Sequence, residues 1–455
     1  MNGLFKRAEV PFPQVLEVAK QSFLGSRIVE EKMAFFFALF LPALLERPPA
    51  ALQPTTRDPR RVPLHTSWWT THQDEFWESV GLLDETSGRV WSTGHVGNMT
   101  LNETQHCTGN LTMPSRSGDV TMPAGGKCTG ASAEKAFNAM LKDVEDVLRA
   151  GGADLPTIAS CLVQTTFPES EGGPARFREM FAERLPNVVL TVVAVKGEWK
   201  YFNASATCNA VNLERAMARP AVVQTPAANL TASSSAAKYA AGLIHATVHE
   251  PTAERAFGAL DDVLREMIMG IEGAATGSTM RTALDLIADC TAFVSTQEQA
   301  AEVRRRFETT MATPPALTVA LDKTGGMHQG VALMCLGTTA PKQAFKSTLA
   351  TGVELRSIAS AGLVFASGAP GFDRDGFDAF AAADAALKAG GGGLDTAVQC
   401  LFFMRTNDDL FLLFDGFREV FNHHNKLPPT RSEYVADSDV CADCMVTAKC
   451  FSTAM

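Results

Sequence analysis

The sequence has no long basic run and almost no apolar stretch that approaches the length of a membrane span. Nucleic-acid surfaces track phosphates with clustered lysine and arginine, so the missing basic run and a net charge of −10 argue against a nucleic-acid partner. A spanning helix needs about 20 apolar residues, so no spanning segment is expected in the mature chain. What is present, 46% hydrophobic and 20% charged residues over 455 positions, is typical of globular domains.

One thirteen-residue apolar run lies near the N-terminus, at Met33–Leu45, and the stretch ERPPA follows it. Such a run fits the hydrophobic region of a signal peptide, so residues 1–50 are predicted to be a targeting or signal-like segment. The 32 residues in front of the run exceed a normal signal-peptide start. Translation from Met33, a buried helix and an unusual targeting sequence are therefore alternatives.

Five Asn-X-Ser/Thr sequons support a secretory route: Asn98, Asn102, Asn110, Asn203 and Asn229. Three of them fall in one Gly/Thr-rich segment, as an exposed loop would allow. The alternative explanation is compositional bias in a chain rich in serine and threonine. The predicted location is the secretory pathway or an organelle reached through a signal peptide; otherwise the protein would be soluble and intracellular.

A helix-like stretch recurs along the chain. AEKAFNAMLKDVEDVL at Ala133–Leu148 is matched 120 residues later by AERAFGALDDVLREMI at Ala253–Ile268, and an alanine-rich version precedes Cys400. Each version leads to an apolar run with a cysteine, a second helix that ends at proline, and two strand-like runs, the last with another cysteine. With a short strand in front, this predicts a unit of strand, helix, strand, helix, strand, strand, present three times. Helices covering one face of a mixed sheet make the fold class α+β.

The three copies set the predicted domain boundaries. Residues 86–219 form the first copy, with an insertion at about Asn98–Thr129; residues 239–340 form the second and residues 341–455 the third. A Ser/Ala-rich linker is predicted at 220–238. Residues 51–85 contain the tryptophan-rich stretch SWWTTHQDEFW and are predicted to dock on the body of the protein, because exposed indoles are rare without a partner.

Three motifs of the third copy carry a family resemblance: GLVFASGAPG, VQCLFFMRTNDDLFLLFDGFREVF and PPTRSEYVAD. In this order they resemble the Rid family (YjgF/RidA, formerly called L-PSP endoribonuclease), and the other two copies match mainly through the third. The resemblance implies a chorismate-mutase-like fold, and homotrimers with ligand pockets at the subunit interfaces. Three copies in one chain then imply a monomeric, single-chain pseudo-trimer.

The resemblance also implies site residues. Arg431 matches the family arginine that grips the carboxylate of a small imino or keto acid, a task that suits the guanidinium fork. Ser367 and Gly368 match the Ser-Gly pair that lines the pocket, and Ser432 follows Arg431 in the motif. Glu354 stands where the family has a tyrosine, as a relocated acid or a surface charge. Without the motif, Arg431 would be interpreted as an ordinary surface arginine.

Several positions depart from the family pattern. The places that match Arg431 hold Val188 in the first copy and Leu317 in the second, and neither side chain binds a carboxylate. The family's acid on the last strand falls near Val446, and its pocket asparagine at Phe414. A valine does not orient water, so imine hydrolysis is poorly supported residue by residue.

The ten cysteines allow several interpretations. The three within-copy pairs are disulfides or buried thiols, and buried thiols are the favoured interpretation because the strand register is unknown: Cys161/Cys208, Cys290/Cys335 and Cys400/Cys450. Cys107 and Cys128 bracket the insertion and are predicted to form a disulfide. The pair in CADC, Cys441 and Cys444, has metal or redox spacing, but a lone pair is weak evidence even with His423-His424 upstream, so no metal is predicted.

Two functions follow for this chain. The first is hydrolysis of small enamine or imine metabolites (2-imino acids) at one pocket, with Arg431 holding the carboxylate and with no cofactor. The second is a non-catalytic protein that binds a small acid or a protein partner. The missing acid at Val446 favours the second, and the intact Pro-x-Arg-Ser and Ser-Gly motifs favour the first. A nuclease fits poorly with the acidic composition.

Overall fold

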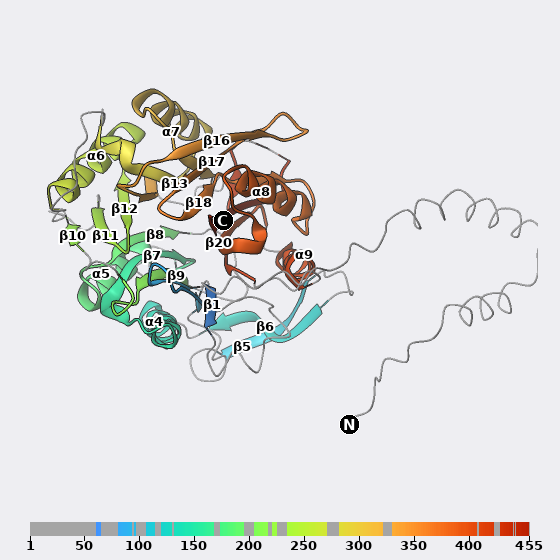
Figure 1. The fold of residues 1–455 in the computed structure, drawn as a ribbon. Helices are drawn as coiled ribbons and strands as arrows, with labels where there is room; N and C mark the ends of the chain where they lie inside the picture. The colour runs from blue at the N-terminus through green and yellow to red at the C-terminus, as the bar shows by residue number, and fades with distance from the viewer. Residues whose placement is uncertain are drawn as a thin grey trace, which may run out of the picture. The chain divides into compact units, whose positions relative to one another are not determined.

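Three mixed β-sheets carry the fold, and two helices pack against one face of each sheet in the described part of the chain (Figure 1). The computed structural model describes residues 61–64, 81–92, 95–96, 106–113, 120–129, 132–167, 173–194, 204–216, 221–224, 234–270, 282–321, 330–406, 409–422, 428–439, 441 and 443–454. The predicted targeting segment and the tryptophans at 68, 69 and 77 lie outside these residues. Sheets of mixed direction with helices on one face confirm the α+β class.

The first sheet has the strand order β1-β2-β3-β9-β7-β8, and β4 pairs with β9. Its strands are β1 (Arg61–Leu64), β2 (Gly81–Asp84), β3 (Arg89–Ser92), β4 (His95–Val96), β7 (Ile158–Thr165), β8 (Val189–Ala194) and β9 (Ala204–Val211). Helices α4 (Ala133–Ala150) and α5 (Gly173–Arg184) pack on it. A separate hairpin, β5 (His106–Met113) with β6 (Val120–Thr129), forms most of the insertion.

The second sheet has the order β10-β11-β12-β15-β13-β14-β22. Its strands are β10 (Ala221–Gln224), β11 (Ser234–Ala240), β12 (Leu243–Glu250), β13 (Ile287–Val294), β14 (Ala316–Leu321), β15 (Val331–Gly337) and β22 (Asp437–Ser438). Helices α6 (Ala253–Gly270) and α7 (Gln297–Thr310) cover it. The last strand, β22, comes from the far C-terminal part of the chain and extends the edge of a sheet built from residues 221–337.

The third sheet has the order β16-β17-β18-β23-β20-β21, and β19 pairs with β23. Its strands are β16 (Gln343–Thr348), β17 (Glu354–Ser360), β18 (Leu363–Ala366), β19 (Ala369–Gly371), β20 (Ala397–Met404), β21 (Thr430–Val435) and β23 (Val446–Thr453). Helix α8 (Phe377–Ala389) packs on the sheet and against α9 (Leu410–Asn422). We refer to each sheet with its helices as the first, second and third unit.

Local sequence explains the helices. In α4 the side chain of Ser132 accepts a hydrogen bond from the backbone N–H of Lys135, and Gly151 follows the last turn. The apolar residues of α4, among them Phe137 and Val144, recur at helical spacing and lie buried against the sheet. The recurring helical stretches at Ala133 and Ala253 are therefore confirmed as helices.

The predicted boundaries need two corrections. Residues 220–238 are not a free linker, because β10 and most of β11 lie there and pair antiparallel with each other. Residues 51–85 likewise contain β1 and β2, which belong to the first sheet. Both segments are rich in small or polar residues and short, so the sequence pattern concealed strands that their neighbours in the sheet stabilise.

The three within-unit cysteine pairs are disulfides, which corrects the preference for buried thiols: Cys161–Cys208, Cys290–Cys335 and Cys400–Cys450. In each pair the middle strand faces the last strand antiparallel, and the two cysteines lie directly opposite each other. Directly opposed side chains are the closest cross-strand neighbours, which is what a disulfide requires. In the insertion, the β5–β6 register places Cys107 opposite Cys128, and their disulfide stays a prediction.

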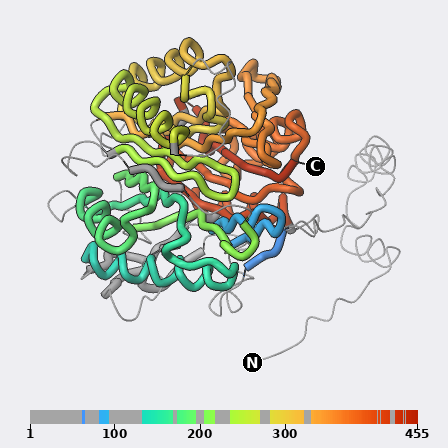
Figure 2. The backbone as a smooth tube through the Cα atoms, turned by 60° about the vertical axis from the view of Figure 1, so that its left-hand side comes forward, coloured from blue at the N-terminus to red at the C-terminus, as the bar shows by residue number. Residues whose placement is uncertain are grey.

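The faces of the three sheets that are turned away from the helices pack against one another. One apolar cluster joins Trp91 of the first sheet, Leu336 of the second and Phe451 of the third, and another joins Val193, Phe293 and Phe403. Figure 2 shows the teal-to-green, yellow and orange-to-red parts of the chain side by side around this contact. Each sheet is thus buried on both faces, and the middle strands β7, β13 and β20 are buried at every residue.

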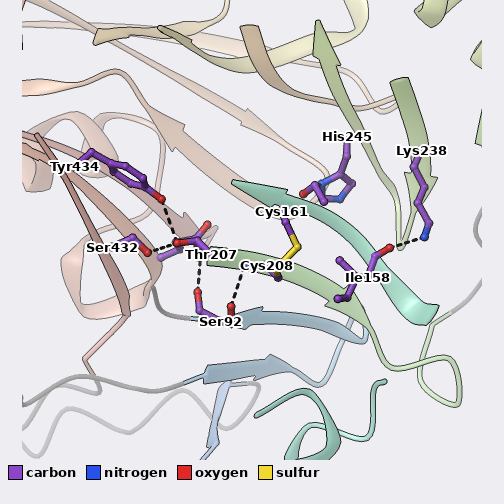
Figure 3. The surroundings of a disulfide bond; sticks show 11 residues. Ser92, Ile158, Cys161, Thr207, Cys208, Lys238, His245, Ser432 and Tyr434 are labelled. Atoms are coloured by element: carbon purple, nitrogen blue, oxygen red, sulfur yellow. Dashed lines mark hydrogen bonds between the residues drawn. A yellow bond between two sulfur atoms is a disulfide. The ribbon is translucent and has the colours of Figure 1, made fainter. Parts of the chain in front are cut away.

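A cation crosses each boundary between units; Arg61 and Lys238 are buried, and Lys342 is half-buried. Lys238 donates to the carbonyl of Ile158 at 2.5 Å, Lys342 donates to Ile287 at 2.7 Å, and Arg61 donates to Ala397 at 2.6 Å (Figure 3 shows Lys238). The three acceptors are the first residues of β7, β13 and β20. The three contacts therefore use the same acceptor position in each unit, although Lys238 lies in the second strand of its sheet, Arg61 in the first, and Lys342 just before the first.

One ion pair lies fully inside this contact region. Lys449 of β23 lies 2.8 Å from Asp289 of β13 and donates to the hydroxyl of Thr291 at 2.8 Å. Burial raises the pKa of Asp289 to about 6, although the ammonium of Lys449 opposes the shift. Lys449 directly precedes Cys450, and the residue that precedes Cys335 in the second unit is Met334. Asp289 directly precedes Cys290, and the residue that precedes Cys161 in the first unit is Ser160.

Across the part of the chain that the structure describes, no helix is both long enough and apolar enough to span a membrane.

We expect Lys449→Met to lower the free energy of unfolding by about 3–5 kcal/mol, because it leaves the buried Asp289 carboxyl without its counter-charge. The double variant Lys449→Met/Asp289→Ser, which uses residues found at corresponding positions, should recover most of that loss. Equilibrium denaturation of the three proteins measures both. A double variant as unstable as the single one would contradict the assignment of the cost to the unpaired carboxyl.

Stability should also rise between about pH 8 and pH 10.5. Burial lowers the pKa of Lys238 and of Lys342 from 10.5 to about 8. In this window the unfolded chain binds more protons than the folded chain, so the free energy of unfolding increases with pH. Denaturation at several pH values should show a smaller increase for Lys238→Met/Lys342→Met than for the wild type, and equal slopes would refute the explanation.

Candidate functional site

A cavity of 210 Å³ lies between the second and third units. One wall comes from α7 and the start of β14, and the other from β17 and the turn between β18 and β19. Its lining residues are Arg304, Phe307, Glu308, Pro314, Pro315, Leu317, Val353, Glu354, Leu355, Arg356, Ser367 and Gly368. The structure thus brings three of the predicted residues to one pocket, Ser367, Gly368 and Glu354.

The Ser367–Gly368 turn is held across the boundary between the units. The backbone N–H of Gly368 donates to the hydroxyl of Thr318 in β14 at 2.8 Å. A Cβ atom at Gly368 would stand 2.7 Å from the methyl of Thr318 and 2.8 Å from that of Thr447, so only glycine permits this approach. The hydroxyl of Ser367 accepts from the N–H of Arg356 at 3.0 Å, which leaves its own hydrogen to donate.

Two guanidinium groups line the pocket, and they differ in their partners. Arg304 forms two hydrogen bonds to the carboxylate of Asp439, one of them at 2.7 Å, and Asp439 is buried. Arg356, whose side chain is 15% exposed, lies 3.1 Å from Glu308, whose side chain is 56% exposed. An exposed carboxylate leaves its partner at little cost, so Arg356 is the cation that an incoming anion can reach.

Strand register identifies the matching positions in the three units. Arg431 stands opposite Cys400, Leu317 opposite Cys290, and Leu190 opposite Cys161. Leu317 therefore occupies, in this pocket, the position that Arg431 has in the third unit. In the first unit the matching residue is Leu190, and not Val188 as predicted. The prediction was wrong because the sequence does not reveal how far a strand is shifted along its neighbour.

Arg431 does not line the pocket that contains Ser367 and Gly368, which corrects the prediction of one site for the three residues. Its side chain is 2% exposed, and its Nε lies 2.5 Å from the Glu433 carboxylate. The guanidinium carbon lies 3.9 Å from the centre of the Phe414 ring. Burial raises the pKa of Glu433, whereas the neighbouring Arg431 charge opposes that shift.

Glu433 gives Arg431 a carboxylate partner from within the same chain. Residues two apart on a strand point to the same face, so Arg431 and Glu433 meet on β21. The motif identifies an arginine that could hold a ligand carboxylate, but here the chain supplies a carboxylate of its own. Arg356 was missed because no motif marks it, and its one signal was its alternation with Glu354 along a strand.

The remaining predicted site residues have clear positions. Glu354 lies on the rim, with half of its side chain exposed, and pairs with Lys346 at 2.8 Å; this ion pair lowers the pKa of Glu354. Ser432 is buried where the third unit meets the first, and its hydroxyl bonds that of Thr207 in β9 at 2.5 Å (Figure 3). Tyr434 reaches the same hydroxyl at 3.1 Å.

No group of three or more His, Cys, Asp or Glu side chains gathers as a metal site among the described residues. Cys441 and Cys444 form a disulfide with each other, and His423-His424 lies outside the described residues. Of the predicted glycosylation sites, Asn110 lies in β5; Asn98, Asn102, Asn203 and Asn229 lie outside the described residues.

No protein-family model matches the sequence, and no curated protein matches it. Among solved structures, a chorismatase aligns at 14% identity over 66% of this chain and 93% of its own, with a TM-score of 0.39. A YjgF/YER057c/UK114 family member from Mycobacterium tuberculosis aligns at 16% identity over 25% of this chain and 99% of its own, with a TM-score of 0.22. E. coli TdcF with bound serine aligns at 16% identity over 22% of this chain and 86% of its own, with a TM-score of 0.20.

We expect Gly368→Ala to destabilise the protein by about 1–3 kcal/mol, because the new methyl group collides with the methyls of Thr318 and Thr447. Adding Thr318→Ser and Thr447→Ser removes both methyls and keeps the hydroxyl that accepts from residue 368. Thermal denaturation should show partial recovery in the triple variant. If the triple variant is less stable than Gly368→Ala alone, the close approach is not the reason for glycine.

Proposed function

We propose that this chain is a Rid-like, single-chain pseudo-trimer that binds a small carboxylate-bearing metabolite in the pocket between the second and third units. Support for the pseudo-trimer comes from the strand order. The strand orders β1-β2-β3-β9-β7-β8, β10-β11-β12-β15-β13-β14 and β16-β17-β18-β23-β20-β21 correspond position by position. In each of them the final two strands are parallel partners. The three cation contacts at the boundaries, from Arg61, Lys238 and Lys342, support the same proposal.

The contrast between two arginines carries the binding proposal. Arg431 is buried and its partner Glu433 is half-buried, so a ligand would have to displace Glu433 to reach the guanidinium of Arg431. Arg356 lies in an open cavity and has a partner that is more than half exposed. A guanidinium pairs both oxygens of a carboxylate, and the Ser367 hydroxyl is placed to donate one more hydrogen bond.

The lining also indicates the size and polarity of the ligand. The cavity of 210 Å³ suits a metabolite of a few heavy atoms. Phe307, Pro314, Pro315 and Leu317 provide an apolar floor for a short carbon chain. Glu308 and Glu354 lie on the same lining and would accept from an ammonium group, so a zwitterion is compatible with the site.

Hydrolysis of 2-imino acids is the second candidate, and Glu308 and Glu354 favour it because each could orient water. Two positions oppose it. Val446, where the resemblance places the water-orienting acid, is buried in β23 between Gly371 and Met404. Leu317 stands in the pocket at the position of the anchor arginine. We therefore favour binding without turnover.

The disulfides support folding in an oxidising compartment. Four pairs are formed in the described part of the chain, and such bonds persist in secreted and organelle-lumen proteins but are rare in the cytosol. This agrees with the predicted signal-like segment and sequons, which remain predictions. Intact-mass analysis of the mature protein from its native source would test the segment and the glycans together.

Binding is tested by titrating the purified chain with pyruvate in a calorimeter. Arg356→Leu should lower the affinity by about tenfold or more, since hydrogen bonds to charged groups contribute about 1.5–3 kcal/mol. The matched control is Arg265→Leu, which removes an exposed arginine paired with Asp261 on α6 and should leave the affinity unchanged. Equal losses in both variants, or none in either, would sink the assignment of the pocket.

Turnover is tested separately by following ammonia release from freshly generated 2-imino acids. We expect no rate above that of buffer, because no water-orienting acid occupies position 446. A rate that disappears in Glu308→Gln or Glu354→Gln, and persists in Arg265→Leu, would instead establish the hydrolase.

A further inference from the structure

The disulfides in the described part of the chain fall into two kinds. In the three cross-strand pairs every cysteine is buried, with exposed fractions of 0–1%. The fourth pair, Cys441–Cys444, lies in the turn between β22 and β23. Here Cys444 is 3% exposed, but Cys441 is only half-buried, so solvent reaches part of this residue.

This difference decides where a thiol can react. Thiol–disulfide exchange requires a thiolate to approach a disulfide sulfur directly, so buried pairs are protected as long as the sheets stay folded. The accessible pair also has a sequence separation of only 3, whereas the cross-strand pairs have separations of 45–50. A disulfide that closes a short loop restricts the unfolded chain less than one that closes a long loop, so it contributes less to stability. Opening Cys441–Cys444 is therefore expected to leave the fold in place.

The same turn is attached to the pocket. Asp437 and Ser438 pair with the edge of the second sheet, and Asp439 holds the guanidinium of Arg304, which lines the cavity. Met445, just after the disulfide, is fixed by backbone hydrogen bonds to Gly371 and Arg405. The disulfide therefore lies in the chain between Met445, whose backbone is fixed, and Asp439, which neutralises Arg304.

We propose that Cys441–Cys444 is a thiol–disulfide exchange site whose opening releases Arg304 from Asp439 and strengthens carboxylate binding in the pocket. The reductant is a dithiol. Its first thiolate attacks Sγ of Cys441, forming a mixed disulfide, and Cys444 leaves as a thiolate. The second thiol of the reductant then attacks the mixed disulfide and releases Cys441. The chain gains two electrons and two protons, and the dithiol becomes a disulfide.

The link to ligand binding rests on the function proposed above, whereas the exchange site does not. Once Asp439 is less firmly held, Arg304 divides its time between Asp439 and a ligand carboxylate. Because the Arg304 side chain is about one-third exposed, the added contact has the strength of a surface ion pair. The expected gain in affinity is roughly two- to fivefold.

The exchange site is tested by alkylating the native protein after treatment with increasing dithiothreitol and locating the modified cysteines by peptide mass spectrometry. Cys441 and Cys444 should be modified at reductant concentrations that leave Cys161, Cys208, Cys290, Cys335, Cys400 and Cys450 unmodified. If the pair stays protected until the buried pairs open too, the site does not exist.

The link is tested on Cys441→Ser/Cys444→Ser, which imitates the opened form. Hydrogen exchange should be faster than in the wild type at residues 437–445, and pyruvate should bind roughly two- to fivefold more tightly. Asp439→Asn should reproduce the tighter binding without reductant. Unchanged exchange and affinity in the double variant would overturn the link. If the wild type does not bind pyruvate at all, the proposed function fails, while the alkylation result still decides the exchange site.

Discussion

Mutual burial of the sheet faces is the constraint on which the other features depend. The helices of each unit cover one face of its sheet, and the opposite face is apolar as well. That second face leaves water only by packing on the other two sheets, around residues such as Trp91, Leu336 and Phe451. The polar groups caught in this contact must then find partners inside it, which explains the lysine and arginine contacts to strand carbonyls and the Lys449–Asp289 pair. The pocket forms where this packing opens at the edge, between α7 and the Ser367–Gly368 turn.

Two arginines illustrate how context decides the role of a side chain. Arg431 lies in a motif that resembles the Rid family, but the carboxylate of Glu433 and the ring of Phe414 enclose it. Arg356 carries no motif, yet it has an exposed partner and an open cavity in front of it. The availability of an arginine's charge therefore depends on neighbours that the motif does not contain.

The sequence was informative where a signal is local. Helical periodicity located α4 and α6, and the Ser-Gly motif located a turn that does line the cavity. It was uninformative where the answer depends on contacts between distant segments. The choice between thiols and disulfides depended on strand register. The enclosure of Arg431 depended on Glu433, which points to the same face of the strand. The strands β10 and β11 depended on their pairing within the second sheet. Arg304 and Asp439 meet across 135 residues, a contact that no local pattern predicts.

The disulfides also make the two walls of the pocket mechanically unequal. Arg304, Phe307, Glu308 and Leu317 all lie between Cys290 and Cys335, so the wall from the second unit is part of a covalently closed loop. Arg356, Ser367 and Gly368 precede Cys400 and lie outside the Cys400–Cys450 loop. A cut in the chain within the first wall leaves both fragments tied together by sulfur, whereas a cut between Arg356 and Ser367 leaves the two sides of that wall joined only by hydrogen bonds and packing.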